Sequence, residues 1–326
     1  MASKTESLRN TIFKAILHDE FPPGSKVPTE REMVERTGTS RVTVRRAYEQ
    51  LHVAGILERQ QGRGTFVARH AGGNPDADEH IALLTSVSER FGLEFISALE
   101  KALIAEDLLL ILRLTDDAPG SEEQAAIGLV AKGIRNLVIW PSGHSFPGDT
   151  FARLRVLGVN MVLFDRMLPG AYADYVGLDN PYAMDQLFAY AMQRGIRHPV
   201  FATHAGAQAD SDNLRRRAFL RACARHGLPG TVVAVPRDRP VTALPPGITD
   251  DSTLFCVNDA MALSLKPHLR DQQILGFDGL TDTIVSCAQP LTEMAHAAVS
   301  LLLRQRKLGA TWRPVRRLFK GTLVNT

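Results

Sequence analysis

The feature that most constrains the fold is a series of short apolar runs between residues 79 and 326. The runs are "HIALLTS", "LLLILRL", "NLVIWP", "NMVLFD", "HPVFATH", "GTVVAV", "TLFCVND" and "QILGFD". Continuous apolar runs of this length are typical of parallel strands that are buried on both faces. Stretches with helical character, such as "SEEQAAIGLVAKG" and "NPYAMDQLFAYAMQRG", separate most of the runs. This alternation predicts an α/β fold with doubly wound parallel sheets.

The boundaries of this region are predicted from composition. The segment 177–180 lies near mid-chain and is expected to cross between two such sheets. Residues 71–78, within "ARHAGGNPDADEH", are rich in Gly, Pro and acidic residues and are predicted to form a linker. We therefore expect three parts: a small domain at 1–70, the linker at 71–78, and a two-lobed α/β domain at 79–326.

The first 70 residues have a different pattern. Apolar residues recur at helical spacing in "LRNTIFKAIL", and "FPPGSKVP" ends that helix. Thr29 and Glu32 form a potential capping box, and Gly38 marks the end of the second helix. A third helix beginning at Ser40 has an apolar stripe, and "ILERQQGRGTFV" predicts a hairpin. Three helices followed by a hairpin indicate a winged helix-turn-helix. The stripe is Val44, Ala47, Tyr48 and Leu51.

Positive charge is concentrated in this small domain. Residues 1–70 hold 12 Lys and Arg against 8 Asp and Glu, whereas the remainder holds 26 against 27. The imbalance is expected if only this segment meets a polyanion. Charge spacing alone also fits a solvated, salt-bridged helix pair. The tip "GRGT" lacks the Gly-Lys-Ser/Thr of a phosphate-binding loop and follows no buried parallel strand.

Residues 8–67 resemble the winged-helix domain of the GntR family of bacterial repressors. The resemblance rests on the lead-in "PPG…PTERE", the turn and helix "GTSRVTVRRA" and the wing "GILERQQGRGTFV". It implies that the domain binds a DNA operator. Val42 departs from the family pattern, which commonly has Thr there, and either contacts a thymine methyl or is merely tolerated. The residues assigned to DNA binding are Arg31, Ser40, Arg41, Thr43, Arg45, Gly62, Arg63 and Gly64.

Several other classes of protein are disfavoured. Cys223, Cys256 and Cys287 have neither metal-ligand nor redox spacing and suit a reducing compartment. No apolar run is long enough to cross a bilayer, and "MASKTESLRN" has no secretory h-region, so a cytoplasmic protein without membrane association is expected. The histidines have no metal spacing, and we see no nucleophile elbow or cofactor lysine. We therefore expect no metal, no cofactor and no enzymatic activity.

Polar residues follow several of the predicted strands. Asp165, Asn258 and Asp278 each come after an apolar run, at the carboxyl end where ligands bind in open α/β sheets. Ser88 and Phe91 follow the first run and are expected at the same rim. Charged and amide groups that serve two hydroxyls, with a ring for stacking, suit a sugar. Asp165 could instead pair with Arg166. Asp259 and Asp179 are expected to cap the helices that follow them.

Residues 79–326 resemble the effector domain of the LacI/GalR repressors, which shares its fold with periplasmic sugar-binding proteins. Matching pieces include "VLFDR…YVGLDN", "SDNLRRRAF", "CVNDAMALSL" and "ILGFDG". The resemblance adds Ser211 and Arg215 to the predicted ligand site, because they match its Ser-x-x-x-Arg. The proline-rich segment 236–247 departs from the family, so one wall of the pocket is expected to be remodelled or lost. A GntR-type head on this domain is an arrangement found in arabinose-type regulators.

Together these patterns predict a transcription regulator whose operator binding is controlled by a sugar-like effector. A homodimer would present two recognition helices to a pseudo-palindromic operator. A regulator with a non-sugar effector, one with a degenerate pocket, and a solute-binding protein remain alternatives.

Overall fold

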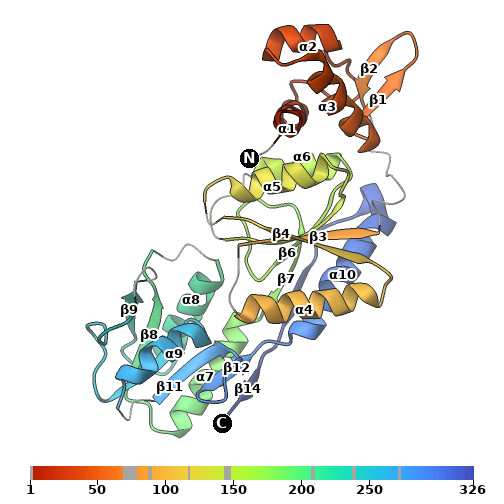
Figure 1. The fold of residues 1–326 in the computed structure, drawn as a ribbon. Helices are drawn as coiled ribbons and strands as arrows, with labels where there is room; N and C mark the ends of the chain where they lie inside the picture. Colours follow the sequence, from red (N-terminus) through yellow and green to blue (C-terminus); the bar gives the residue numbers. More distant parts are fainter. Residues whose placement is uncertain are drawn as a thin grey trace.

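The computed structural model describes residues 3–68, 79–86, 90–116, 118–142, 148–206, 210–236, 240–270 and 273–326. In Figure 1 a small helical domain with a hairpin lies above a lobe built on one sheet. A second lobe, also built on a sheet, lies below and to the side. The mixed α/β architecture with an N-terminal helix-turn-helix confirms the predicted fold class. The exact domain boundaries remain a prediction.

The small domain consists of α1 (Lys4–Leu17), α2 (Glu30–Thr37), α3 (Arg41–Val53) and the antiparallel hairpin β1 (Leu57–Gln60) and β2 (Gly64–Val67). The predicted capping box is present: Thr29 accepts from the Glu32 backbone, and the Glu32 carboxylate accepts from the Thr29 backbone at 2.8 Å. Gly38 follows α2 in the left-handed conformation. The predicted stripe of α3 is buried, so its opposite face is left for solvent or a partner.

The amino-terminal lobe is built on a six-stranded sheet of order β13-β7-β6-β5-β3-β4. Its strands are β3 (His80–Thr85), β4 (Leu109–Leu114), β5 (Asn136–Trp140), β6 (Asn160–Phe164), β7 (Asp174–Leu178) and β13 (Arg316–Phe319), and all of their pairings are parallel. Helices α5 (Ser121–Val130) and α6 (Gly148–Val156) cover one face. Helices α4 (Arg90–Ile104) and α10 (Leu291–Leu308) cover the other (Figure 1).

Alternate residues of these strands pack into two separate apolar cores. Leu84 and Ile139 pack with α5 and α6, whereas Leu83 and Val138 pack with α4 and α10. Because successive side chains of a strand point to opposite faces, an apolar residue at every position is needed to fill both cores. This requirement explains why the runs in the sequence are continuous rather than alternating.

The carboxy-terminal lobe has a second six-stranded sheet, of order β14-β12-β11-β10-β8-β9. Its strands are β8 (His198–His204), β9 (Thr231–Val235), β10 (Ser252–Cys256), β11 (Gln273–Asp278), β12 (Val285–Ala288) and β14 (Thr322–Val324). Its helices are α7 (Asn180–Gln193), α8 (Asp210–Arg225) and α9 (Asp259–Leu265). Strand β14 pairs antiparallel with β12. This sheet is therefore mixed, whereas the sequence predicted a wholly parallel one.

The chain passes between the lobes three times. It leaves the first sheet after β7 and starts α7 at Asn180, as the sequence predicts. It returns when β12 is followed by α10, which packs on α4, and it leaves again between β13 and β14. The two later crossings were not predicted, because β12, β13 and β14 are only three or four residues long and lack the continuous apolar pattern.

The proline-rich segment 236–247 forms no helix in its described residues, which are 236 and 240–247. Val241, Leu244 and Ile248 pack against the core of the carboxy-terminal lobe instead, and His268 Nε2 lies 2.9 Å from the Val241 carbonyl oxygen. Proline cannot donate a helical hydrogen bond, so an irregular chain takes the place of a covering helix.

No helix among the described residues is long and apolar enough to cross a membrane.

Candidate functional site: a DNA-binding face and an interlobe cleft

Helix α3 presents an exposed basic face at its amino-terminal end. Arg41 and Arg45 are exposed on this face, and Val42 lies between them with 61% of its side chain accessible. Ser40 caps the helix by accepting from the Thr43 backbone, and the two hydroxyls are 2.8 Å apart. The predicted residues of α3 therefore lie together, at the end of a helix where unpaired N–H groups favour an anion.

Glu30 links the two arginines to α2. Its carboxylate accepts from Arg41 Nε at 3.1 Å and from Arg45 Nε at 3.2 Å. The two guanidinium groups lower the pKa of Glu30, with the Arg45 hydrogen bond the larger effect. Arg31, the third predicted arginine, is 86% exposed and pairs with Glu35 in the next turn of α2. All three arginines remain exposed despite these pairs.

The hairpin tip has the backbone geometry that its glycines predict. Gly62 and Gly64 both have positive φ, +72° and +119°. A Cβ on Gly64 would lie 2.7 Å from Lys26 Cε, the end of a flexible side chain that can move aside, so the positive φ is what favours glycine at this position. The Arg63 guanidinium lies 5.8 Å from the Phe66 ring. The tip thus carries one basic residue, Arg63, on a short, glycine-dependent turn, with Lys26 beside it.

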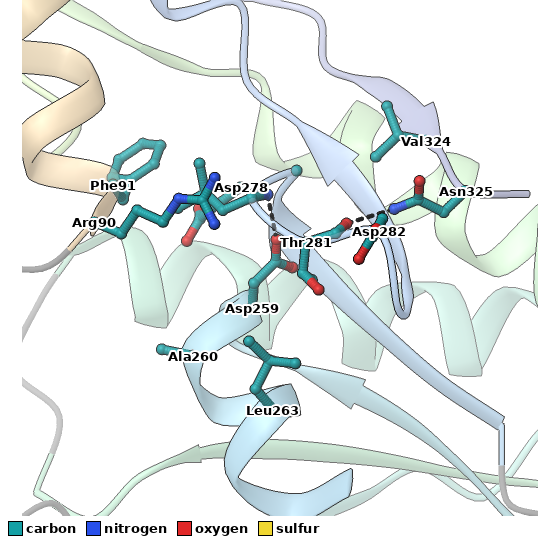
Figure 2. A pocket seen from close by; sticks show the side chains of 12 residues that line it. Arg90, Phe91, Asp259, Ala260, Leu263, Asp278, Thr281, Asp282, Val324 and Asn325 are labelled. Atoms are coloured by element: carbon teal, nitrogen blue, oxygen red, sulfur yellow. Dashed lines mark hydrogen bonds between the residues drawn. The ribbon is translucent and has the colours of Figure 1, made fainter.

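The second candidate site is a pocket of about 640 Å³ between the two lobes. In Figure 2, Arg90 and Phe91 of α4 lie on one side, and residues of the carboxy-terminal lobe face them. Of the seven residues that the sequence assigns to ligand binding, Phe91 and Asp278 line this pocket. The carboxy-terminal lobe contributes Asp259, Ala260, Leu263, Asp278, Gly279, Leu280, Thr281, Asp282, Val324 and Asn325.

Asp278 and Arg215 form a buried polar pair beside the pocket. Arg215 Nη2 lies 3.8 Å from Asp278 Oδ1, and the guanidinium also donates to Asn180 Oδ1 and the Val257 carbonyl oxygen. Gln289 Nε2 donates to Asp278 Oδ1 at 2.9 Å. Burial raises the pKa of Asp278 to about 8, although Arg215 opposes the shift. Desolvation therefore outweighs a charge that is close but not in hydrogen-bond contact.

Asp165 follows β6 of the amino-terminal lobe and pairs with Ser211 in α8 of the carboxy-terminal lobe, so this second polar pair joins the two lobes. Ser211 Oγ donates to Asp165 Oδ2 at 3.3 Å, and Trp140 Nε1 donates to the same oxygen at 3.3 Å. Arg166 Nε lies 3.5 Å from it, which is the pairing considered as an alternative role for Asp165. Asp165 and Asp278 both have positive φ, +61° and +110°. Such strain in non-glycine residues at strand ends is frequent at functional sites.

Two of the predicted positions differ in detail from the expectation. Asn258, not Asp259, caps α9, because its side chain accepts from the Met261 backbone at 2.8 Å. Asp259 is buried instead, accepts from Ser286 Oγ and the Leu280 backbone, and lines the pocket. The expectation that Asp179 caps α7 is confirmed. Ser88 lies outside the described residues.

Comparison with known proteins assigns the small domain. Residues 4–67 match the model of the bacterial regulatory proteins of the gntR family. The N-terminal domain belongs to the GntR family. The match confirms the resemblance drawn from the sequence, and it places the basic face of α3 and the glycine-rich wing within a GntR helix-turn-helix domain.

Relatives extend the comparison beyond the GntR domain. An arabinose metabolism transcriptional repressor of Geobacillus stearothermophilus is 24% identical over 336 residues, which cover 91% of this chain and 89% of the relative.

Two solved structures share the fold of the part that follows the GntR domain. A periplasmic binding protein/LacI transcriptional regulator of Alkaliphilus metalliredigens, complexed with D-xylulofuranose, aligns with a TM-score of 0.63 and 17% identity, over 76% of this chain and 97% of the other. The trehalose repressor of Escherichia coli aligns with a TM-score of 0.60 and 17% identity, over 76% and 100%. The two-lobed domain thus has the periplasmic-binding-protein-like fold.

One aromatic residue beside the cleft was not predicted from the sequence. Trp140 meets Phe91 edge-to-face, with ring centroids 5.5 Å apart, and it holds Asp165. Phe91 is buried in this aromatic group, so the ring predicted for stacking presents little surface. Trp140 is the last residue of the apolar run of β5, and Asp165 directly follows the run of β6. Its place at the carboxyl end of a strand could have marked Trp140 as a candidate cleft residue.

Proposed function

We propose that this chain is a transcription repressor whose operator binding is controlled by a small molecule in the interlobe cleft. The observation that carries the proposal is the basic, exposed face of the GntR domain in the same chain as a two-lobed domain with a polar pocket. Neither part needs a catalytic role, so we infer that the protein is not an enzyme. Because its partner is an operator, we place it in the cytoplasm.

The proposed effector is a sugar or a sugar derivative. The pocket combines carboxylates and a threonine with apolar surface from Leu263 and Leu280, which suits a ligand with hydroxyls and apolar faces. The repressor of Geobacillus stearothermophilus named above acts in arabinose metabolism, which makes arabinose the first sugar to test. Asp165, Ser211, Arg215, Asn258 and Asp278 remain the proposed ligand-binding residues, with Phe91 and Ser88 at the rim.

The proposed assembly is a homodimer formed through the amino-terminal lobe. Strand β4 is at the edge of its sheet and exposes Leu109, Leu112 and Leu114. Leu93 and Ile104 of the neighbouring α4 are also exposed. An unpaired strand edge with exposed leucines is an association surface, and a two-fold axis would pair it with its own copy. Such a dimer presents two GntR domains to a pseudo-palindromic operator.

The test combines DNA selection with a ligand screen on the full chain. Selection from random-sequence duplex DNA should enrich a palindromic site. A thermal-shift screen against arabinose, xylose, ribose, fructose, trehalose and their phosphates should then find a stabilising ligand, because ligand that binds only the folded state raises the melting temperature. Adding that ligand should release the selected DNA. Failure to enrich any DNA site would contradict the proposal.

A second candidate differs only in the effector. None of the described residues of the proline-rich segment lines the pocket, so the pocket lacks the wall that this part of the family's fold supplies. A non-sugar effector is therefore the alternative, and a screen in which only non-sugar metabolites stabilise the chain would favour it.

A further inference from the structure

The GntR domain is docked on the amino-terminal lobe of its own chain. We call the contact the head-docking surface, and it consists of α1 and the α3–β1 corner against α5, α6 and the α5–β5 corner. Helix α1 contacts both α5 and α6, and Figure 1 shows it directly above them. A single buried apolar cluster runs from Phe13 in α1 through Ile127 in α5 to Leu163 in the sheet. The domain and the lobe therefore share one core.

Polar contacts fix this docking at three points. Arg135 is 4% exposed and its Nη2 donates to the carbonyl oxygen of Ala54, the C-cap residue of the recognition helix α3. Arg153 donates to the carbonyl oxygen of Leu17, the last residue of α1. Lys132 Nζ lies 3.4 Å from Glu6 Oε1.

Arg135 connects the recognition helix to the lobe directly. Its Nη1 donates to the Val130 carbonyl oxygen at 2.8 Å, at the end of α5, while Nη2 reaches Ala54. Both acceptors lie at helix carboxyl termini, where the partial negative charge favours a cation. These hydrogen bonds offset part of the cost of burying the guanidinium in the docked state. The orientation of α3 is thus tied to α5 of the lobe.

We propose that the head-docking surface sets the distance and angle between the two recognition helices, so that Arg135 and Arg153 determine which half-site spacing the protein reads. The inference rests on the proposed function, in which a dimer of lobes carries two heads. A covalent connection alone fixes neither the distance nor the angle between domains, whereas a shared core and a bridging guanidinium fix both. Helix-turn-helix dimers read half-sites at a spacing that matches the separation of their recognition helices.

The assignment places specificity determinants outside the GntR domain. Arg135 and Arg153 belong to the lobe and touch no residue assigned to DNA binding. Their loss should leave the recognition of each half-site unchanged and relax only the spacing between half-sites. A loss of a DNA-contacting residue would have the opposite effect, because it weakens every half-site equally.

Two kinds of variant test the proposal in the full chain. Ala54→Cys/Gly133→Cys locks the docked state, because a Cβ on Gly133 would lie 3.9 Å from Ala54 Cβ, within the range of a disulfide. The three native cysteines are buried. Gly133 has φ of +96°, so Gly133→Cys alone is the control for backbone strain.

Two further variants are designed to release the GntR domain from the lobe: Arg135→Met, and the double variant Lys132→Glu/Arg153→Glu. The second variant places carboxylates opposite Glu6 and Asp19 on the exposed edge of the contact, so it keeps the test usable if Arg135→Met does not fold. Arg216→Glu/Arg217→Glu on α8 makes the same change in net charge on the carboxy-terminal lobe, away from the heads.

The readout is spacing selectivity in DNA binding. Each protein is used to select sites from random-sequence DNA, and its affinity is measured for the selected site and for one lengthened by half a helical turn, ~5 bp. Wild type, the oxidised lock and the α8 control should enrich one spacing and lose about tenfold or more on the lengthened site. The undocked variants should enrich the same half-site at several spacings and lose less than about threefold.

The outcomes separate the inference from the proposed function. An undocked variant as strict in spacing as wild type would overturn the inference, as would failure of the lock to form on oxidation of the full chain. Wild type that enriches half-sites at many spacings would also overturn it, while leaving the proposed function intact. Wild type that enriches no DNA site would contradict the proposed function itself. Introducing the lock into Lys132→Glu/Arg153→Glu should restore the single spacing.

Discussion

At the residue scale, Glu30 shows how a charged helix pair can serve two roles. Its carboxylate pairs with Arg41 and Arg45 and so fits the solvated, salt-bridged reading of the sequence. The arginines nevertheless remain exposed. Exposed ion pairs contribute little to stability, so they hold the side chains only loosely. The same pairs therefore leave both guanidinium groups available to DNA, and the two readings are compatible.

Arg45→Ala is expected to weaken binding to the selected operator by about 1–3 kcal/mol if Arg45 reads a base. The measurement is an equilibrium titration of labelled DNA, with Arg225→Ala as the control. Arg225 is also an exposed, ion-paired arginine, but it lies on α8. Equal affinities for Arg45→Ala and wild type would remove Arg45 from the interface.

Asp278 makes the stability of the effector domain depend on pH. Its pKa is raised by burial to about 8, from an ordinary value of 3.8. Between these values the unfolded carboxyl is ionised while the folded one keeps its proton, so the folded state binds more protons and stability falls as pH rises. In the variant Asp278→Asn the amide is uncharged, like the protonated carboxyl, and asparagine tolerates the positive φ of this position.

The melting temperature of wild type should therefore decrease between pH 5 and pH 8 by more than that of Asp278→Asn. Parallel pH profiles for the two proteins would show that Asp278 is ionised when folded. Asp282→Asn is the matched control, because Asp282 also lines the pocket but is more exposed.

At the scale of elements, α5 connects the cleft with the head-docking surface. Arg166, beside Asp165, donates to the Ser142 carbonyl oxygen at 3.2 Å. The Ser142 backbone donates to Glu122 in the first turn of α5 at 2.5 Å. The other end of α5 meets Arg135. These contacts form a continuous chain from Asp165 to the helix that supports α3.

Strand β4 carries the prediction about assembly. Leu112→Glu/Leu114→Glu should convert a dimer into a monomer, because it places charges on the proposed self-complementary edge. Sedimentation equilibrium or light scattering measures the change, and the folded state is checked by circular dichroism. Leu220→Glu, on an exposed leucine of α8, is the control. A variant that stays dimeric would place the interface elsewhere.

At the scale of the whole molecule, charge is distributed unevenly between the parts. The balance of residues 1–70 is positive and that of the remainder is close to neutral. Operator affinity should accordingly fall steeply with salt, since binding releases counterions condensed on DNA. With roughly 6–10 phosphate contacts for a dimer, the slope of log K against log[salt] is about −5 to −9.

The control for this titration is ligand binding to the same protein. Binding of a neutral sugar in the interlobe pocket releases no condensed ions, so its affinity should change little over the same range of salt. A slope near zero for DNA would contradict an electrostatic DNA interface.

The local structure could be predicted from the sequence, because it depends on periodicity and on residues with special backbone roles. The continuous apolar runs specified strands buried on both faces. Thr29, Glu32 and Gly38 specified the ends of α2, and the stripe of α3 specified which of its faces stays outside. The short strands β12, β13 and β14 escaped prediction, since their pairing partners lie far away in the chain.

The meeting of polar groups and the placement of the domains depend on tertiary packing and could not be predicted. No spacing in the sequence indicates that Arg215 reaches Asp278, or that Asn258 caps α9 while Asp259 turns toward Ser286. Arg135 and Ala54 are 81 positions apart, and their contact gives the docked head its orientation. Long-range contacts of this kind depend on how completed elements pack, and packing is a property of shape and burial that no single window of sequence contains.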